Sequence, residues 1–323
     1  MLGIRNLTIA FPTADKPLLM VKNFSLRIEE QAKTILLGES GSGKSLVLLA
    51  ILRLLPAEAQ CTGEILFRGR DIGRMDAKAL QSLRGRQIAY IPQGAGNSLN
   101  PLTRIGVQVM EGLPLAAGES RERKAVDILA PFGFKEAAEV ARAYPHTLSG
   151  GMKQRVLIAM GLARNASLTL ADEPTKGLDP SRIHTVIEAF QKLQTQAVLC
   201  VTHDLAFAES YADQIVVMYA GHQLEISAKK EFFREPRHPY SQALLAALPE
   251  NGLHDLTGFA PPHTSEGSGQ CIFFDRCPRR FSLCEKEPPM IQQDDREVRC
   301  WLYAADHAGD YRTLSERGAS VRP

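Results

Sequence analysis

The sequence predicts an α/β fold built around a largely parallel sheet with one antiparallel edge. Short apolar runs of strand length alternate with segments of helical periodicity along most of the chain of 323 residues. The runs contain few polar interruptions, which is typical of strands that are buried on both faces of a sheet. Only the opening run, LGIRNLTIAF from Leu2, alternates apolar with polar residues, so we expect it to form the antiparallel edge.

The elements follow one another in strand–helix order. A strand is expected at KTILLGES, a helix at KSLVLLAILRLL, and further strands at QIAYIPQ, LTLADEP and AVLCVTHD. Helical patterns dominate between about Gly106 and Ala163, which predicts a helical subdomain at about 95–165 inserted in the core. We see no internal repeat, so each element is present once.

The composition changes after about Lys230. REPRHPYSQALLAALP predicts one amphipathic helix, and TGFAPPHTSEGSGQ is rich in Pro, Gly and Ser and predicts a mobile connector. A cysteine-bearing segment follows, and a polar tail over 306–323 is expected to be disordered. We therefore expect a main domain over 1–230 and a small extension over 231–305.

Charge and hydropathy exclude several classes of protein. With 38 basic and 36 acidic residues, the formal net charge of +2 does not indicate nucleic acid as a partner. The N-terminus lacks the regions of a signal peptide, and the longest apolar stretch, LVLLAILRLLP, contains Arg53 and is too short to cross a bilayer. We expect the chain to fold in the cytosol and to reach a membrane only through partners.

The stretch GESGSGKS fits the phosphate-loop pattern, follows a predicted strand and opens a predicted helix. Its glycines let backbone N–H groups turn toward an anion, and the helix N-terminus adds its positive dipole end. The lysine can reach the β- and γ-phosphates, and the last serine hydroxyl can bind Mg²⁺. The predicted nucleotide-binding residues are Gly38, Glu39, Ser40, Gly41, Ser42, Gly43, Lys44 and Ser45.

Acidic residues and a histidine follow two of the later strands. Asp172 can join Ser45 in the Mg²⁺ shell, and the adjacent Glu173 can orient or deprotonate an attacking water. His203 follows the strand AVLCVT and is placed to touch a γ-phosphate. Taken without its position, a lone histidine would be read as an ordinary packed or surface residue.

A second glycine-rich segment, LSGGMKQR, opens the predicted helix GMKQRVLIAMGLA. A serine hydroxyl and two glycine amides at a helix start form another anion cradle. The motifs together, in this order, resemble those of the ATP-binding cassette (ABC) family over about residues 1–250. The resemblance implies that this signature segment contacts ATP held by a partner subunit, through Leu148, Ser149, Gly150, Gly151 and Gln154.

The resemblance assigns further roles. Phe11 lies where the family places an aromatic residue that stacks on adenine, and Gln93 matches a glutamine that contacts Mg²⁺ and faces the membrane partner. Asp179 matches the D-loop aspartate, His203 the switch histidine and Glu173 the catalytic glutamate. Lys176 in TKGLDP departs from the usual family string. These matches imply an ATPase that is active as a dimer.

Three strings, NSLNPLTRIGVQVMEGL, YPHTLSGGMKQRVLIAMGLA and RHPYSQALLAALP, resemble the oligopeptide/dipeptide/nickel importer branch. The branch implies a second, different ABC ATPase subunit, two transmembrane permeases and an extracytoplasmic substrate-binding protein. It also implies peripheral attachment at the cytoplasmic face of the inner membrane. Peptides are the expected cargo, with nickel or a metal–metallophore complex as the alternative. A nucleic-acid- or ribosome-associated ABC ATPase is disfavoured because no sustained heptads separate the phosphate loop from the signature.

Six cysteines are present, and we expect Cys61 and Cys200 to fill the core. The other four lie close together in the extension, at Cys271, Cys277, Cys284 and Cys300. Clustered thiols in a reducing compartment indicate a metal before disulfides. Zn²⁺, an iron–sulfur cluster and bare thiols remain open on spacing, and the branch resemblance favours a [4Fe–4S] cluster. Its role would be to staple a segment too short to build a core of its own.

Overall fold

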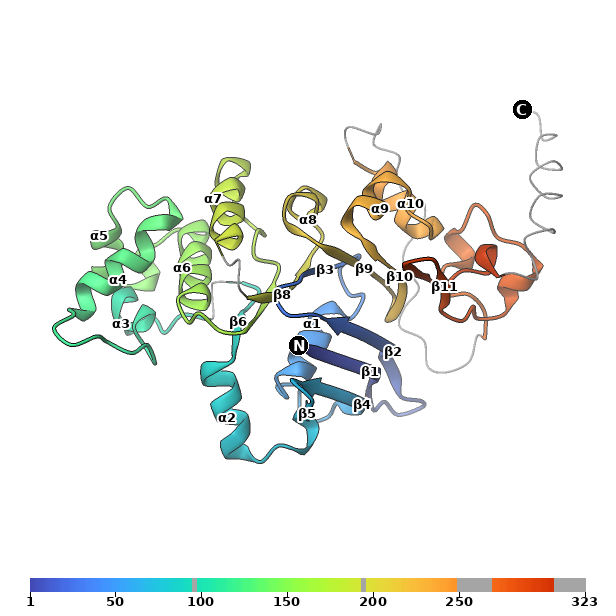
Figure 1. Ribbon diagram of the computed structural model, residues 1–323, viewed down its shortest axis with the longest axis horizontal. Helices are drawn as coiled ribbons and strands as arrows, with labels where there is room; N and C mark the ends of the chain where they lie inside the picture. Colours follow the sequence, from blue (N-terminus) through green and yellow to red (C-terminus); the bar gives the residue numbers. More distant parts are fainter. Residues whose placement is uncertain (95–97, 193–195, 249–268, 305–323) are drawn as a thin grey trace.

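The computed structural model describes residues 1–94, 98–192, 196–248 and 269–304. Most of the predicted connector over 257–270 and the predicted disordered tail over 306–323 lie outside these residues. The described residues form a twisted sheet with helices around it, as the alternating pattern predicts (Figure 1).

The strands pair in the order β5-β4-β1-β2-β10-β9-β3-β8-β7-β6, and β12 pairs with β10 and β11. The pairings among β9, β3, β8, β7 and β6 are parallel, whereas β1, β2, β4 and β5 pair antiparallel. The strands are β1 (Leu2–Phe11), β2 (Leu18–Ile28), β3 (Lys33–Leu37), β4 (Gln60–Phe67), β5 (Arg70–Asp71), β6 (Ile88–Ile91), β7 (Leu168–Asp172), β8 (Ala197–Thr202), β9 (Gln214–Tyr219), β10 (His222–Ala228), β11 (Ile291–Gln293) and β12 (Arg296–Val298).

The mixed sheet matches the predicted fold class. The predicted strands appear as β3, β6, β7 and β8, and the alternating N-terminal run forms β1 in the antiparallel end. Within that end β1 lies between β2 and β4, so β4 and β5 make the outer margin. Alternation is therefore the signature of a strand with one solvated face, whether or not the strand is outermost.

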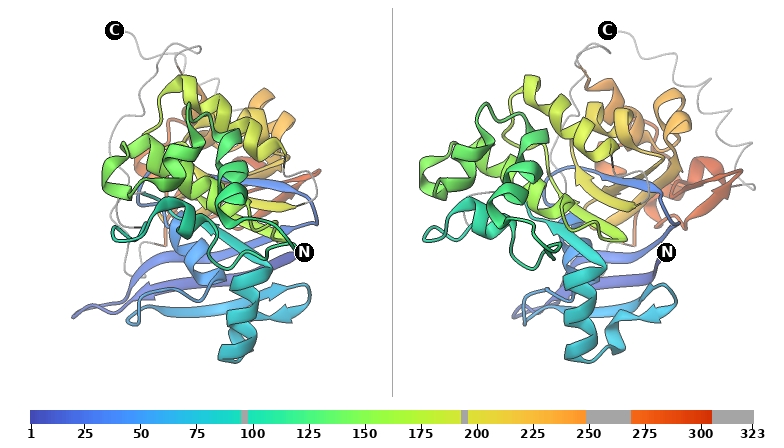
Figure 2. Two further views of the ribbon diagram at one scale, coloured as in Figure 1. Left: turned by 90° about the vertical axis from the view of Figure 1, so that its left-hand side faces the viewer. Right: turned by 60° about the vertical axis from the view of Figure 1, so that its left-hand side comes forward.

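The helices are grouped by their position in the chain. Helices α3 to α6 gather at one end of the molecule, away from the antiparallel strands (Figures 1 and 2), which agrees with the predicted helical region. The helices are α1 (Lys44–Ile51), α2 (Ala77–Arg86), α3 (Ile105–Val109), α4 (Arg121–Leu129), α5 (Ala137–Arg142), α6 (Gly150–Leu162), α7 (Pro180–Gln191), α8 (Leu205–Tyr211), α9 (Lys229–Arg234) and α10 (Pro239–Ala246).

Two apolar cores lie on opposite faces of the parallel strands. In β3, Ile35 and Leu37 belong to the core on the side of the helical region, while Leu36 belongs to the core shared with α1 and the antiparallel strands. All three side chains are at most 1% exposed. Burial on both faces explains why the KTILL run contains no alternating polar residues.

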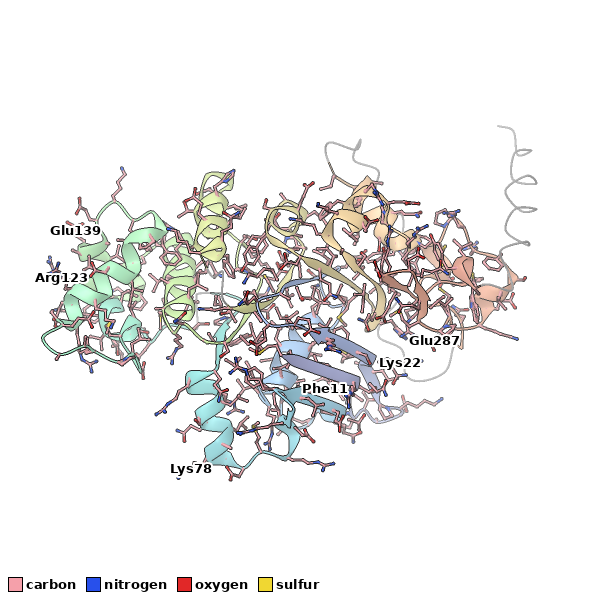
Figure 3. All side chains as sticks on the ribbon, viewed as in Figure 1. Phe11, Lys22, Lys78, Arg123, Glu139 and Glu287 are labelled. Atoms are coloured by element: carbon pink, nitrogen blue, oxygen red, sulfur yellow. The ribbon has the colours of Figure 1, made fainter. Side chains whose placement is uncertain are left out.

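The cysteine-bearing extension is joined to the main sheet. Strand β12 pairs antiparallel with β10, and Phe273 is buried in the larger core at 1% exposure. Glu287 also forms a 2.6 Å ion pair with Lys22 of β2 (Figure 3). A metal or cluster bound by the cysteine thiols would thus add to the strand pairing, the apolar packing and the ion pair that hold this short segment against the sheet.

The two cysteines expected in the core behave differently. Cys200 is fully buried in β8, in agreement with the prediction. Cys61 is exposed, so the prediction for it was wrong. It stands near the start of β4, where the residues from Gln60 to Gly63 are all exposed although this strand pairs with β1.

Candidate functional site

The loop Gly38–Ser45 connects β3 to the first turn of α1, as the motif requires. The Lys44 ammonium is buried and donates hydrogen bonds to the carbonyl oxygens of Gly38 at 2.8 Å and Glu39 at 2.7 Å. Burial lowers the pKa of Lys44, while the carboxylates of Glu173 and Asp172 act in the opposite direction. A buried cation whose hydrogen bonds go to neutral loop oxygens suits the charge of a phosphate.

Glycine is required within the loop for a steric reason. Gly43, immediately before α1, has φ of 92°, and a Cβ atom there would lie 2.5 Å from the carbonyl oxygen of Met20. Gly41 has φ of 82° but faces open space, because no atom would lie within 4 Å of its Cβ. One side of the loop is therefore packed against backbone and the other is open to a ligand.

Ser45 and Asp172 come together across the sheet. The Ser45 hydroxyl donates a 2.9 Å hydrogen bond to Oδ1 of Asp172, which is buried at the end of β7. Burial raises the pKa of the Asp172 carboxyl group, whereas the bond from Ser45 opposes this shift. A hydroxyl and a carboxylate are hard oxygen donors of the kind that Mg²⁺ prefers, so these residues fit the ion.

Glu173 and His203 are neighbours beyond the ends of β7 and β8. Nδ1 of His203 lies 2.8 Å from Oε2 of Glu173, an ion-pair distance, and this buried oxygen has no hydrogen-bond partner among the described residues. The Glu173 carboxylate is 8% exposed and the His203 ring is 58% exposed. Glu173 also has φ of 50°, an uncommon conformation for a residue with a side chain and one that is found at functional sites.

The backbone next to this pair is held by the sheet. The amide of Glu173 donates a 2.8 Å hydrogen bond to the carbonyl oxygen of Val201 in β8. The amide of Glu173 is thus fixed to the sheet at the point where the backbone becomes left-handed. This brings its carboxylate beside Asp172 and near Lys44, since charges on both carboxylates act on the Lys44 pKa.

The signature segment lies at the start of α6. Ser149 is exposed and caps the helix, accepting a 3.3 Å hydrogen bond from the amide of Met152. Gly150 is also exposed, and a Cβ atom on Gly151 would lie 3.5 Å from the side chain of Leu178. The segment therefore presents Ser149 and Gly150 outward while it packs against the loop that leads to Asp179.

Two other members of the predicted signature set lie below this surface. Leu148 is 8% exposed and belongs to the larger core. Gln154 is 4% exposed, and its amide nitrogen donates a 3.4 Å hydrogen bond to the carbonyl oxygen of Pro174. In this chain the helix turns the Gln154 side chain inward, toward the loop that follows Glu173, and its contact with a partner's nucleotide stays a prediction.

The remaining predicted residues occupy separate places. Phe11 ends β1 and is half-buried against the core beside α1 (Figure 3). Gln93 is exposed just after β6, and Asp179 is exposed at the N-terminus of α7. These positions leave Gln93 and Asp179 accessible to other molecules.

The four cysteines of the extension are free thiols in one neighbourhood. Burial raises the pKa of Cys271 to about 11 and that of Cys300 to about 12, and negative charge on the other extension thiols adds to both shifts. The amide of Cys271 donates a 2.9 Å hydrogen bond to the carbonyl oxygen of Cys284. Within the described residues, no three His, Cys, Asp or Glu side chains form a metal-binding group as they stand.

Contacts to the phosphate loop from the C-terminal part of the chain were missed by the sequence analysis. Tyr240 of α10 accepts a 3.1 Å hydrogen bond from the amide of Glu39, and Arg276 forms an ion pair with the Glu39 carboxylate at 3.0 Å. The sequence signal for this contact is the string DRCP, in which Arg276 directly precedes Cys277.

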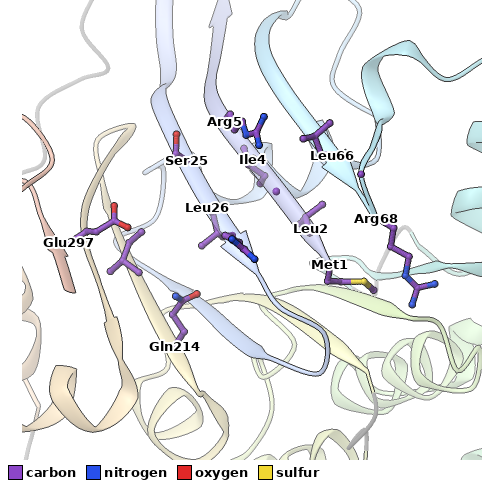
Figure 4. A pocket seen from close by; sticks show the side chains of 14 residues that line it. Met1, Leu2, Ile4, Arg5, Ser25, Leu26, Leu66, Arg68, Gln214 and Glu297 are labelled. Atoms are coloured by element: carbon purple, nitrogen blue, oxygen red, sulfur yellow. The ribbon is translucent and has the colours of Figure 1, made fainter. Parts of the chain in front are cut away.

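A hollow of about 430 Å³ lies elsewhere, on the antiparallel strands (Figure 4). Its arginines are paired with acidic neighbours, as Arg5 is with Glu64 and Arg68 is with Glu30. It contains none of the predicted nucleotide-site residues.

Across the described residues, no helix has both the length and the apolar composition needed to cross a bilayer.

Comparison with known proteins agrees with these motifs. The model of the ABC transporter family matches residues 21–176, and that of the oligopeptide/dipeptide transporter C-terminal region matches residues 224–284. A solved ATP-binding cassette, a dimer in a post-hydrolysis state bound to ADP and Pi, has a TM-score of 0.64 and 27% identity, covering 71% of this chain and 99% of its own. The cassette cbiO1 from Clostridium perfringens has a TM-score of 0.59 and 27% identity, covering 77% and 96%.

Curated relatives match over almost the whole length. The dipeptide transport ATP-binding protein DppD of Escherichia coli K12 is 37% identical over 323 residues, covering 96% of this chain and 98% of the relative. The oligopeptide transport ATP-binding protein OppD of Bacillus subtilis 168 is 34% identical over 321 residues, covering 95% and 90%. The chain therefore belongs to the ABC transporter family of ATPases, in the branch that carries the oligopeptide/dipeptide transporter C-terminal region.

Proposed function

We propose that this chain is one ATP-hydrolysing subunit of an importer for dipeptides or oligopeptides. The observation that carries the proposal is the match to DppD over both the cassette and the extension, at 96% of this chain and 98% of the relative. The division into a cassette over 1–230 and an extension over 231–305 belongs to this proposal.

In the proposed mechanism the loop Gly38–Ser45 binds the phosphates of ATP. Lys44 gives up its hydrogen bonds to loop carbonyl oxygens and binds the β- and γ-phosphates instead. The loop amides donate hydrogen bonds to the remaining charged phosphate oxygens. Ser45 and Asp172 would hold Mg²⁺, which neutralises charge on the phosphates when bound. Phe11 stacks on the base.

Glu173 is the proposed general base. It orients and deprotonates the attacking water, and the nearby His203 contacts the γ-phosphate. The backbone at Glu173 is left-handed, and the charge of its carboxylate acts on Lys44 of the loop. Gln93 is exposed just after β6, where its contact with a membrane partner can change when the site binds or hydrolyses ATP.

A second cassette subunit completes the site. The exposed Ser149 and Gly150 are proposed to contact ATP bound to the partner's phosphate loop, and the exposed Asp179 lies at the same interface. Two ATP molecules would hold the dimer together, and hydrolysis would release it. We propose a heterodimer that works with two permeases and an extracytoplasmic binding protein, peripherally on the cytoplasmic face of the membrane.

The test is reconstitution with two permeases and a binding protein of this transporter branch from the same organism. A peptide that saturates the binding protein is expected to stimulate ATP hydrolysis and to accumulate in vesicles, whereas nickel salts are not. Stimulation by nickel or by a metallophore complex, without any response to peptides, would replace the proposed cargo. Co-purification with nucleic acid in place of permeases would reject the transport function.

We further propose that Cys271, Cys277, Cys284 and Cys300 hold a [4Fe–4S] cluster. Four free thiols in one short segment supply the soft ligands that such a cluster requires, and they would have to move closer together than they stand here to hold it. Assays of iron, sulfide and zinc on anaerobically purified protein will decide. Zinc alone at one equivalent would replace the cluster by a zinc site, and absence of all three would leave bare thiols.

A further inference from the structure

An arginine from the extension contacts the phosphate loop directly. Nη1 of Arg276 lies 3.0 and 3.2 Å from the two carboxylate oxygens of Glu39 and donates a 3.2 Å hydrogen bond to the hydroxyl of Tyr219. The guanidinium carbon lies 5.5 Å from the centre of the Tyr219 ring. With an Arg276 side chain that is 7% exposed, this ion pair is shielded from solvent more than an ordinary surface pair.

Glu39 is held at three points. Its amide donates to the Tyr240 hydroxyl at 3.1 Å, its carbonyl oxygen accepts from Lys44 at 2.7 Å, and its carboxylate pairs with Arg276. The neighbouring Gly38 and Gly41 both have positive φ values and add freedom to the loop. The contacts to Glu39 therefore restrict the part of the loop that glycine leaves most free.

Arg276 is itself fixed by its surroundings. It ends a short 3-10 turn, Phe274–Arg276, directly before Cys277. The preceding Phe273 packs edge-on against Tyr219, with ring centres 5.4 Å apart, and against Tyr240 at 5.5 Å. Although burial disfavours its charge, the bonds to Tyr219 and Glu39 raise the pKa of Arg276 above its ordinary value.

We propose that Arg276 is a positioning residue for the phosphate loop, through which the extension sets the affinity for ATP. The inference rests on the proposed use of Gly38–Ser45 as the nucleotide site. Arg276 has no need to touch the nucleotide: by holding Glu39 it orders a glycine-rich loop before ATP arrives. Ordering the loop beforehand removes a cost that binding would otherwise carry.

The test compares Arg276→Gln with Arg280→Gln in the full chain. Arg280 lies in the same segment, and its guanidinium donates to the carbonyl oxygens of Phe274 and Asp275, within the extension. Titration with a fluorescent ATP analogue is expected to show about tenfold weaker binding for Arg276→Gln, the worth of one charged hydrogen bond. Binding by Arg280→Gln is expected to stay within twofold of wild type.

The kinetics distinguish positioning from catalysis. In the assembled transporter, Arg276→Gln is expected to raise KM for ATP by the same factor while kcat stays within about twofold. Arg276→Lys, which can still pair with one carboxylate oxygen, is expected to restore part of the affinity. Loss of kcat with unchanged KM would overturn the proposal.

A double-mutant cycle keeps the test independent of one variant. Glu39→Gln is expected to weaken ATP binding as Arg276→Gln does, and combining the two should add little. Fully additive effects, or an Arg276→Gln affinity equal to that of Arg280→Gln, would refute the coupling. Lys44→Ala separates the two hypotheses. If Lys44→Ala still binds ATP with wild-type affinity, the proposed nucleotide site is wrong. If Lys44→Ala loses ATP affinity while Arg276→Gln keeps it, only the role of Arg276 is rejected.

Discussion

The hydroxyl of Ser45 donates a 2.9 Å hydrogen bond to Oδ1 of Asp172, although 127 positions separate the two residues in the chain. Ser45 stands in the first turn of α1, and Asp172 ends β7. The sheet thus brings together two oxygen ligands that the proposed mechanism uses for Mg²⁺.

We predict that Ser45→Ala weakens the response to Mg²⁺. Removal of one oxygen ligand should raise the Mg²⁺ concentration for half-maximal ATPase activity about tenfold or more, since even outer-shell partners are worth that much. The measurement is a Mg²⁺ titration at saturating ATP, with Ser210→Ala as the control because its hydroxyl bonds within α8. Superimposable titrations for Ser45→Ala and wild type would exclude a role for Ser45 in holding the ion.

The general base assigned to Glu173 can be tested by Glu173→Gln. Turnover of the assembled transporter should fall by about 10²–10⁴-fold, the usual worth of a general base, while ATP still binds. The exposed Glu209 on α8 offers the matched control Glu209→Gln, which should keep wild-type turnover. Activity of Glu173→Gln within twofold of wild type would remove the residue from this role.

Gly43→Ala is predicted to destabilise the fold more than Gly69→Ala. Both glycines have positive φ, so alanine costs about 1–2 kcal/mol at either position. At Gly43 the new Cβ would also lie 2.5 Å from the Met20 carbonyl oxygen, whereas Gly69 faces open space. We expect an additional cost of about 1–3 kcal/mol for Gly43→Ala, measured by urea denaturation. Equal denaturation midpoints would show that the loop can move aside.

A fourth prediction concerns pH. His238 is 1% exposed, and its Nδ1 accepts a 3.0 Å hydrogen bond from the amide of Tyr240, which requires the neutral ring. Burial lowers the pKa of His238 from 6.5 to about 3. Between these values the unfolded chain binds a proton that the folded chain does not, so the stability contribution present above pH 6.5 is lost as pH falls, by about 1.4 kcal/mol per pH unit.

His238→Asn keeps a hydrogen-bond acceptor but cannot titrate. The difference in unfolding free energy between wild type and this variant should therefore shift by about 1.4 kcal/mol per pH unit below pH 6.5. Urea denaturation at several pH values measures this difference, with the exposed His184→Asn as the control. Parallel pH profiles for wild type and His238→Asn would contradict the assignment.

Local patterns account for much of the fold and the site. The phosphate loop, the acidic pair after β7 and the signature helix could all be recognised because each is a continuous string whose neighbours are strands or helices. The order of these strings was enough to predict the family. The mixed sheet and its helical region could be predicted from hydrophobic periodicity, because periodicity indicates which faces of a strand or helix are buried.

Other features depend on pairings that no short string contains. The sequence alone determined that this chain has a nucleotide loop, a signature helix and a cysteine-bearing extension. Only the tertiary structure decided that Gln154 points inward, that Cys61 is exposed, and that Arg276 lies on Glu39 across 237 positions. The physical reason is that secondary structure follows from neighbouring residues, whereas burial and ion pairing follow from strand order, which is settled by the packing of the whole chain.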